Sequence, residues 1–96
     1  MEQVRIIARA VAREGKADEL KALLQKMVSP TRSEQGCRYY ELFESNVPGI
    51  FYFHELWHSK EDLEAHAASR HFTDVFGKAK DLLKEPLEVN FLQEVQ

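Results

Sequence analysis

The stretch FYFHELWHSKEDLEAH, residues 51–66, decides the fold because it predicts a strand that runs directly into a helix. Side chains alternate along a strand, so Glu55 and Trp57 share one face with two phenylalanines. Ser59 then stands at the N-cap position of the helix, and Asp62 follows three residues later, as in a capping box. The segment thus brings aromatic rings, a carboxylate and, further along the helix, an imidazole to neighbouring places. This predicts a small apolar pocket with a few polar groups.

Three further strands and one further helical region are expected around this unit. With the unit included, the strands are predicted at residues 4–11, 37–45, 51–57 and 86–95, and the two helical regions start near residues 17 and 60. Pro30 is expected to kink or end the first helical region, because proline removes one intrahelical hydrogen bond. Ser69 is expected to cap a second stretch of the later region, whose apolar stripe continues until Pro86 ends the helix. Alternation along residues 37–45 predicts that Cys37 and Tyr40 point to opposite faces.

The order strand–helix–strand–strand–helix–strand predicts an α+β fold, a ferredoxin-like antiparallel sheet with both helical regions on one face. Ninety-six residues without linkers or repeats predict a single domain over residues 1–96. The strands carry apolar side chains on both faces, whereas the helices can cover only one. The other face is therefore expected to pack against a second copy in a homodimer, and it carries Ile7, Val11, Tyr52 and Leu56.

The composition excludes several classes of function. The net charge is −3 with both signs interspersed, and no basic stripe is present, so nucleic acid is not an expected partner. No apolar run approaches the roughly 18–20 residues of a membrane span, and the single cysteine, Cys37, rules out an internal disulfide, so a cytoplasmic protein is expected. The four glycines form no GxGxxG or Walker loop, and no GxSxG or HExxH occurs, so no cofactor is expected.

Glu55 is the main candidate for chemistry, because a carboxyl group set between aromatic side chains is desolvated. Desolvation raises its pKa, so that it can accept or donate a proton near neutrality. His66 is a second candidate base, since an unperturbed imidazole has a pKa of about 6.5. Two structural alternatives stay open at this stage: Glu55 pairs with an arginine or lies at the sheet edge, and His66 makes a purely structural hydrogen bond.

The four histidines do not predict a metal site. His54 and His58 share a strand face but lie about 13 Å apart, too far to bind one ion at about 2 Å, and they are expected to face solvent or the partner sheet. His66 and His71 flank the break between the two later helices and can approach each other. The sequence offers no cysteine or paired carboxylate to complete their ligand set, so no metal ligands are assigned.

Two segments, EQGCRYYELFES at residues 34–45 and FYFHELWHSKEDLEAHAASRHF at residues 51–72, resemble the antibiotic biosynthesis monooxygenase superfamily, especially its small bacterial members similar to quinol monooxygenases. The likeness extends over nearly the whole chain. It implies a dimeric α+β barrel with a ligand pocket between each sheet and its helices. It also implies oxidation of a quinol or phenol by O2 without flavin, metal or haem, so that the organic substrate supplies the electrons.

The resemblance gives the candidate residues their roles. Glu55 or His66 is the expected catalytic base, which takes a proton from the substrate. The expected substrate-binding residues, which would surround a small aromatic or quinone-like ligand, are Trp57, Tyr40, Phe53, Leu63, His71, Phe72 and Phe76.

Other activities of the superfamily and one role without catalysis are the alternatives. A haem-degrading branch uses an asparagine and an iron-ligating histidine where this chain has Ala8 and Phe76, which argues against haem degradation. An isomerase branch that acts on autoinducer-2 phosphate shares the pattern of the two helical histidines, and Arg70 and Lys78 are candidate phosphate ligands. The third alternative is a dimeric module that binds a small molecule without chemistry.

Overall fold

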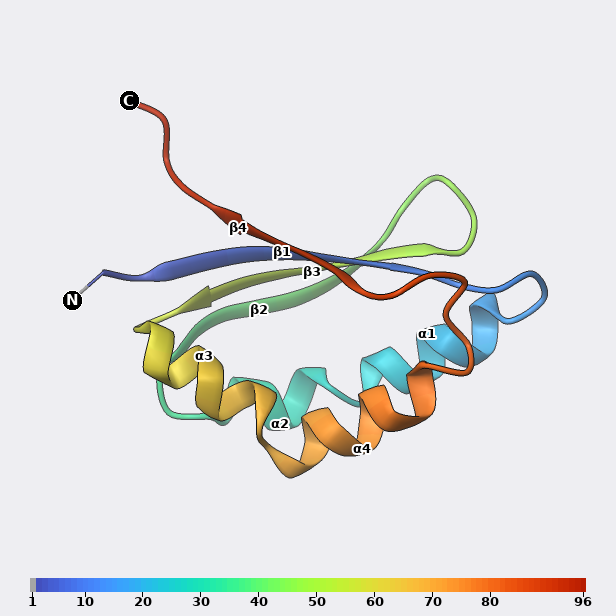
Figure 1. Ribbon diagram of the computed structural model, residues 1–96, viewed down its shortest axis with the longest axis horizontal. Helices are drawn as coiled ribbons and strands as arrows, with labels where there is room; N and C mark the ends of the chain where they lie inside the picture. Colours follow the sequence, from blue (N-terminus) through green and yellow to red (C-terminus); the bar gives the residue numbers. More distant parts are fainter. Residues whose placement is uncertain (1) are drawn as a thin grey trace.

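The computed structural model describes residues 2–96 and shows one antiparallel sheet with all helices on one face (Figure 1). The strands are β1 (Val4–Val11), β2 (Cys37–Glu44), β3 (Ile50–Trp57) and β4 (Glu88–Leu92). They lie in the order β2-β3-β1-β4, and each neighbouring pair is antiparallel. This arrangement confirms the predicted α+β, ferredoxin-like fold.

The helices enclose the core against the sheet. They are α1 (Ala17–Gln25), α2 (Val28–Arg32), α3 (Lys60–Ala67) and α4 (Arg70–Ala79), and none in residues 2–96 could cross a membrane. Both predicted caps form: Ser59 Oγ accepts the Asp62 N–H at the start of α3, and Ser69 Oγ accepts the Phe72 N–H at the start of α4. The largest fully buried side chains of the core include Trp57, Phe51, Phe53, Leu20, Leu24 and Met27.

The first helical region breaks ahead of Pro30. α1 ends at Gln25 and α2 begins at Val28, so Pro30 lies in the first turn of α2. In one continuous helix the amide of residue 30 would bond to the Lys26 carbonyl, but proline has no N–H and its ring would clash with that carbonyl. The first turn of a helix needs no such donor, and therefore tolerates proline.

A β-bulge at Arg38 changes which side chains of β2 face the helices. Cys37 pairs with Trp57, and Tyr40 pairs with Glu55, because the register shifts just after Cys37. One extra residue in a strand reverses the alternation of side chains beyond it. The prediction that Cys37 and Tyr40 point to opposite faces is therefore wrong, since both share the face of Glu55 and Trp57.

The last helix and the last strand are shorter than predicted. α4 stops at Ala79 instead of continuing towards Pro86, and β4 has five residues, fewer than the predicted strand at residues 86–95. The intervening segment turns back onto the end of β1, where the Lys84 N–H donates to the Val11 carbonyl at 2.8 Å. This pairing with β1, which is distant in the sequence, takes the place of further turns of α4. The local pattern of apolar residues contains no signal for such a long-range pairing.

Strand β4 is an edge of the sheet that no helix covers. Val89 and Phe91 pair with Ala8 and Ile6 of β1, so they point to the helix side of the sheet. Phe91 nevertheless remains 65% exposed, and Leu92, on the opposite face, is also exposed. This edge therefore carries apolar surface without a partner among residues 2–96.

Gly36, in the turn before β2, is expected to tolerate no side chain. Its φ is +89°, and an added Cβ would overlap the Asp62 carboxyl group. Asp62 Oδ2 accepts the Ser59 hydroxyl at 2.9 Å in the cap of α3, so displacing Asp62 would disturb that cap. Gly36→Ala should lower the free energy of unfolding by about 2–4 kcal/mol, from left-handed backbone strain together with overpacking.

Gly15→Ala is the matched control for this prediction. Gly15 also has a positive φ, +78°, but its Cβ position has nothing within 4 Å. Gly15→Ala should lower the free energy of unfolding only by the cost of the left-handed backbone conformation, about 1 kcal/mol. Urea unfolding of the two variants measures the difference, and equal losses would show that Asp62 makes room for the methyl group without cost.

Candidate active site

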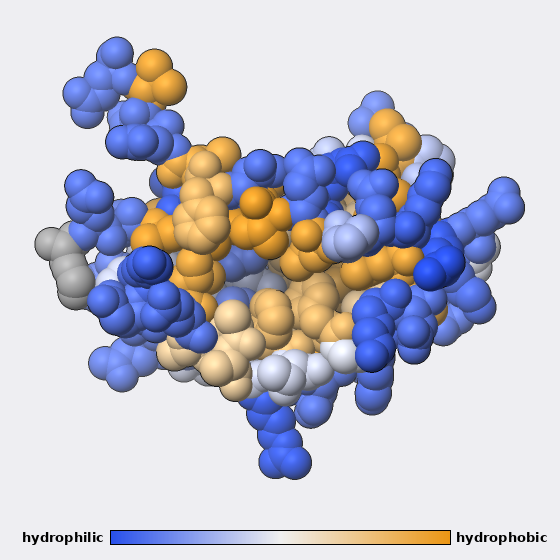
Figure 2. Space-filling view, in the orientation of Figure 1, coloured by the Kyte–Doolittle hydropathy of each residue, from blue (hydrophilic) through white to orange (hydrophobic). Residues whose placement is uncertain are grey.

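An apolar cavity of about 190 Å³ lies between the sheet and the helices. Figure 2 shows its opening as a hollow with an apolar floor across the middle of the molecule. Seven of the nine predicted site residues line it, namely Tyr40, Phe53, Glu55, Leu63, His66, Phe72 and Phe76. Side chains from β1 and from the segment around β4 complete the wall, among them Ile6, Ala8, Leu87, Val89 and Phe91. The wall therefore contains one carboxyl group and one imidazole in otherwise largely apolar surroundings.

Glu55 projects from β3 and is only 6% exposed. Its Oε1 accepts a hydrogen bond of 2.9 Å from the indole Nε1 of Trp57. Burial raises the pKa of Glu55 to about 6; the indole hydrogen bond opposes this rise, and the negative charge of Glu34 adds to it. No arginine in residues 2–96 forms an ion pair with Glu55, so the alternative of an arginine partner is not realised.

His66 projects from α3 and is 2% exposed. Its Nδ1 lies 2.6 Å from Glu34 Oε2, and its ring packs against Trp57 with ring centroids 4.6 Å apart. Burial lowers the pKa of His66, although the Glu34 carboxylate acts in the opposite direction. Burial therefore favours the neutral form of the imidazole, which can donate from Nδ1 to the Glu34 carboxylate.

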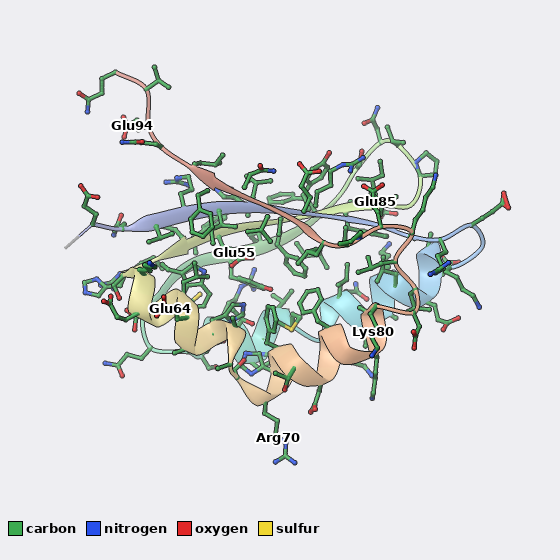
Figure 3. All side chains as sticks on the ribbon, viewed as in Figure 1. Glu55, Glu64, Arg70, Lys80, Glu85 and Glu94 are labelled. Atoms are coloured by element: carbon green, nitrogen blue, oxygen red, sulfur yellow. The ribbon has the colours of Figure 1, made fainter. Side chains whose placement is uncertain are left out.

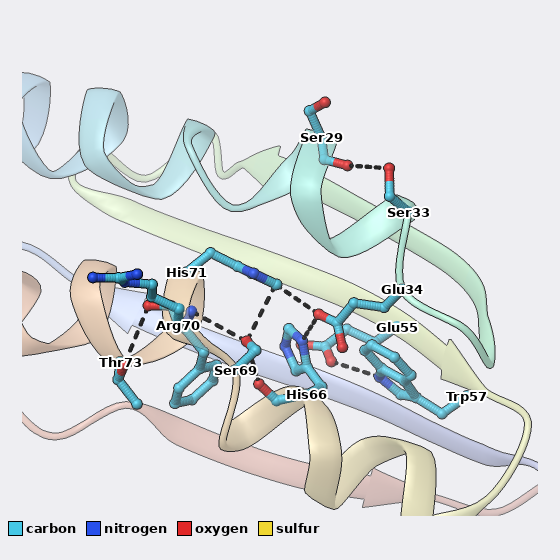
Figure 4. A network of polar contacts seen from close by, with 11 residues as sticks. Ser29, Ser33, Glu34, Glu55, Trp57, His66, Ser69, Arg70, His71 and Thr73 are labelled. Carbon is cyan, nitrogen blue, oxygen red and sulfur yellow. Dashed lines mark hydrogen bonds and ion pairs between the residues drawn. The ribbon is translucent and has the colours of Figure 1, made fainter.

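The hydrogen bonds around Ser69 fix where the protons lie (Figure 4). The Ser69 hydroxyl donates to the His66 carbonyl at 2.7 Å and accepts the Phe72 N–H at 3.3 Å. His71 Nε2 lies 3.2 Å from Ser69 Oγ, whose own proton is already donated, and 2.6 Å from Glu34 Oε2. We therefore assign the tautomer in which Nε2 of His71 carries the proton and donates it to the carboxylate. Glu34 thus accepts from both imidazoles, and Nε2 of His66 is left as a proton acceptor.

Glu34 is the residue of the candidate site that the sequence analysis missed. It lies in the loop between α2 and β2, 32 positions before His66, and no local pattern marks it. The donor atoms of Glu34, His66 and His71 all lie within 4.8 Å of one another, so these three residues could also hold a divalent ion such as Zn²⁺ or Fe²⁺. Glu34 thus supplies the third possible metal ligand that the sequence analysis did not find. The hydrogen bonds from the two imidazoles to Glu34 explain the same arrangement without a metal ion.

Trp57 and His71 are the two predicted binding residues that do not line the cavity. Trp57 is fully buried behind it, where its indole touches Glu55 and His66. His71 reaches the site through its hydrogen bond to Glu34 and lies beside His66, with ring centroids 5.9 Å apart. The geometry therefore gives both residues supporting positions, with no direct contact between their side chains and the cavity.

The residues named for other activities lie elsewhere or lack suitable atoms. Arg70 points away from the sheet and the cavity (Figure 3), and Lys78 does not line the cavity. Ala8 and Phe76 both line it, but neither side chain has an atom that could ligate haem iron. His54 lies outside the cavity, where its Nε2 is 2.7 Å from Arg5.

Comparison with known proteins agrees with this geometry. Residues 3–78 match the family model described as "Antibiotic biosynthesis monooxygenase". The chain is 37% identical to "Putative monooxygenase Rv0793" of Mycobacterium tuberculosis over 93% of this chain and 88% of that protein. It is 32% identical to "Putative monooxygenase YcnE" of Bacillus subtilis over 77% of this chain and 79% of that protein.

Solved structures of similar proteins have the same fold. The structure of Rv0793 gives a TM-score of 0.92 at 35% identity and covers 99% of this chain and 97% of that chain. The structure of PA3566 from Pseudomonas aeruginosa gives a TM-score of 0.92 at 28% identity, with 100% and 97% covered. This chain therefore belongs to the antibiotic biosynthesis monooxygenase family.

Proposed function

We propose that this protein is a cofactor-independent monooxygenase that oxidises a quinol or phenolic small molecule with O2. The observation that carries the proposal is that two groups able to accept a proton, the Glu55 carboxyl group and the His66 imidazole, line one apolar cavity. A pKa of about 6 for Glu55 and a lowered pKa for His66 leave both groups able to accept a proton at pH 7.

The walls of the cavity suit a flat aromatic ring. Phe53 packs against Tyr40 with ring centroids 5.1 Å apart, and against Phe76 with centroids 6.4 Å apart. A substrate ring in contact with these side chains would direct a hydroxyl group to Glu55 or His66. Aromatic side chains favour such offset and edge-to-face contacts.

The difference in pKa between the substrate hydroxyl and the base determines how long the phenolate exists before it reacts with O2. A phenolic hydroxyl has a pKa of about 10, so giving its proton to a group of pKa about 6 is uphill by about 5 kcal/mol. The phenolate is therefore a transient species that reacts with O2 as it forms. One oxygen atom forms a bond to a ring carbon, and the other leaves as water. Conversion of a ring C–H bond to C–OH and of the quinol to a quinone supplies the four electrons that O2 takes up.

The proposal includes a homodimer in the cytoplasm. The exposed edge around Phe91 supports the dimer, and so does the sheet face without helices, whose Ile7, Val11, Tyr52 and Leu56 are only half-buried within one chain. Pairing with a second copy would remove this apolar surface from water. Phe91 also lines the cavity, so a second copy seated there would help to close it. A lone cysteine, which allows no internal disulfide, is consistent with the cytoplasm.

Turnover of a panel of quinols in air and under nitrogen tests the proposed reaction. We expect product formation with one O2 consumed per substrate in air, in protein stripped with a chelator, and no product under nitrogen. Product formed at the same rate under nitrogen would favour an isomerase. Saturable quenching of Trp57 fluorescence without product in either gas would favour a binding module, and dependence on an added metal would contradict the cofactor-free reaction.

A further inference from the structure

A second, outer cavity lies next to the active-site cavity. This outer groove has a volume of about 500 Å³ and lies between α4 and the segment that leads to β4. Phe72, Phe76 and Leu87 line both cavities, so these three side chains form a wall that the two share. In Figure 3, Glu55 is labelled on the sheet, where it lines the active-site cavity, and Lys80 is labelled at the end of α4, where it lines the outer groove.

Three cations from separate parts of the chain line the outer groove. They are Arg13 after β1, Lys80 at the end of α4, and Lys84 in the segment before β4. Backbone hydrogen bonds hold these parts together: the Arg13 N–H donates to the Leu82 carbonyl, and the Lys84 N–H donates to the Val11 carbonyl, both at 2.8 Å. These backbone bonds keep the segments that carry the three exposed cations next to one another.

The three cations have no anionic partners among residues 2–96. None of Arg13, Lys80 and Lys84 lies within ion-pair distance of a carboxylate. Glu85 also lines the groove, but its Oε1 already pairs with the Arg9 guanidinium at 3.0 Å. Because the whole chain has a net charge of −3, this excess of positive charge is local and not a consequence of a basic composition.

The volume of the active-site cavity, here called the inner cavity, limits which part of a substrate it can hold. An engineered apolar cavity of about 150 Å³ binds one benzene ring. The inner cavity, at about 190 Å³, therefore accommodates one aromatic ring with small substituents and little else. A longer part of a substrate that leaves this cavity past Phe72, Phe76 and Leu87 would end beside the cations.

We propose that the outer groove binds an anionic group of the substrate, a carboxylate or phosphate on a side chain of the reacting ring, through Arg13, Lys80 and Lys84. The inference rests on the proposed oxidation for the identity of the ring, and it deepens that proposal by naming the substrate class. The ligand is an amphipathic molecule whose phenolic head lies beside Glu55 and His66 while its charged end remains in the wetter groove.

Binding of matched ligand pairs under nitrogen tests this class without any chemistry. The probes are (2,5-dihydroxyphenyl)alkanoic acids with side chains of two to six carbons, each paired with its uncharged primary amide. Quenching of the single tryptophan, Trp57, reports binding, because the indole donates to the Glu55 carboxyl group that lines the cavity. We expect one chain length at which the acid binds roughly tenfold more tightly than the amide in low salt, and a smaller ratio in high salt.

The variant Arg13→Gln/Lys80→Gln/Lys84→Gln should abolish this preference for the acid while leaving amide binding unchanged. The control Lys26→Gln/Lys60→Gln/Lys78→Gln removes the same charge from positions that line neither cavity and should retain the preference. In turnover, the first variant should raise KM for the acid and leave kcat unchanged. Equal binding of acid and amide by the native protein, or a preference that survives in the first variant, would overturn the inference.

These outcomes are separable from those of the proposed reaction. Preferential binding of the acids with no O2 consumed would leave the anion site standing and remove the oxidation. Oxidation of neutral quinols as efficiently as of the acids would leave the reaction standing and remove the anion site.

Discussion

Replacing Glu55 by Gln and His66 by Ala in the same chain is expected to reduce kcat/KM for quinol oxidation by about 10²–10⁴-fold, the range that a positioned general base contributes. Both proton acceptors of the cavity are then lost, while its aromatic walls remain. O2 consumption by the double variant and by each single variant measures the effect. The single variant whose rate equals that of the double variant identifies the base, because groups that act as one unit have non-additive effects.

The pH profile makes this prediction more specific. If Glu55 is the base, kcat/KM should fall as the pH drops through about 6, where the carboxylate becomes protonated. Glu55→Gln should remove that limb of the profile, whereas His66→Ala should retain it. A double variant that turns over at the native rate would show that neither group is the base.

Stability provides the control for folding. Because the folded pKa of Glu55 is raised from 4.5 to about 6, its contribution to stability is fully present below pH 4.5 and is lost as the pH rises through 6. At pH 8 the buried charge costs about 2 kcal/mol, so Glu55→Gln should be at least as stable as the native protein there. Glu64→Gln/His58→Ala, with both side chains outside the cavity, is the matched control and should keep full activity.

Replacing Glu34 by Gln is expected to lower kcat by about 10²–10⁴-fold if His66 is the base, with little change in KM. An amide can donate as well as accept, so it no longer forces the protons onto Nδ1 of His66 and Nε2 of His71. Nε2 of His66 is then no longer held as the proton-accepting nitrogen of that imidazole. Glu34 does not line the cavity, so substrate binding should be nearly unaffected.

Two companion variants separate this positioning role from a purely structural one. Glu34→Asp keeps a carboxylate and should recover part of kcat, whereas Glu64→Gln removes an exposed carboxylate from α3 and should change nothing. A Glu34→Gln protein that unfolds more easily but has the native kcat per folded molecule would show that Glu34 only supports the fold. In that case Glu55 would be the better candidate for the base.

The element pattern was largely readable from the sequence because the forces that define it are local. Ser59 and Ser69 cap their helices as predicted, since an N-cap depends only on the next three residues. The alternation along β3 correctly placed Glu55 among aromatic side chains, because residues two positions apart in a strand lie on the same face of the sheet. The bulge at Arg38 broke the same rule in β2, since a bulge is set by pairing with the neighbouring strand.

The sequence by itself determined the ferredoxin-like order of elements and the meeting of Glu55 and His66 at one pocket, because a strand that leads straight into a helix leaves their relative placement little freedom. Only the tertiary structure decided that Glu34 would join them. The path of a loop and the contact of residues 32 positions apart depend on how the whole sheet and its helices pack, and no periodicity encodes that. The same packing decided that Trp57 and His71 would lie outside the cavity lining, and that Arg13, Lys80 and Lys84 would line one outer groove.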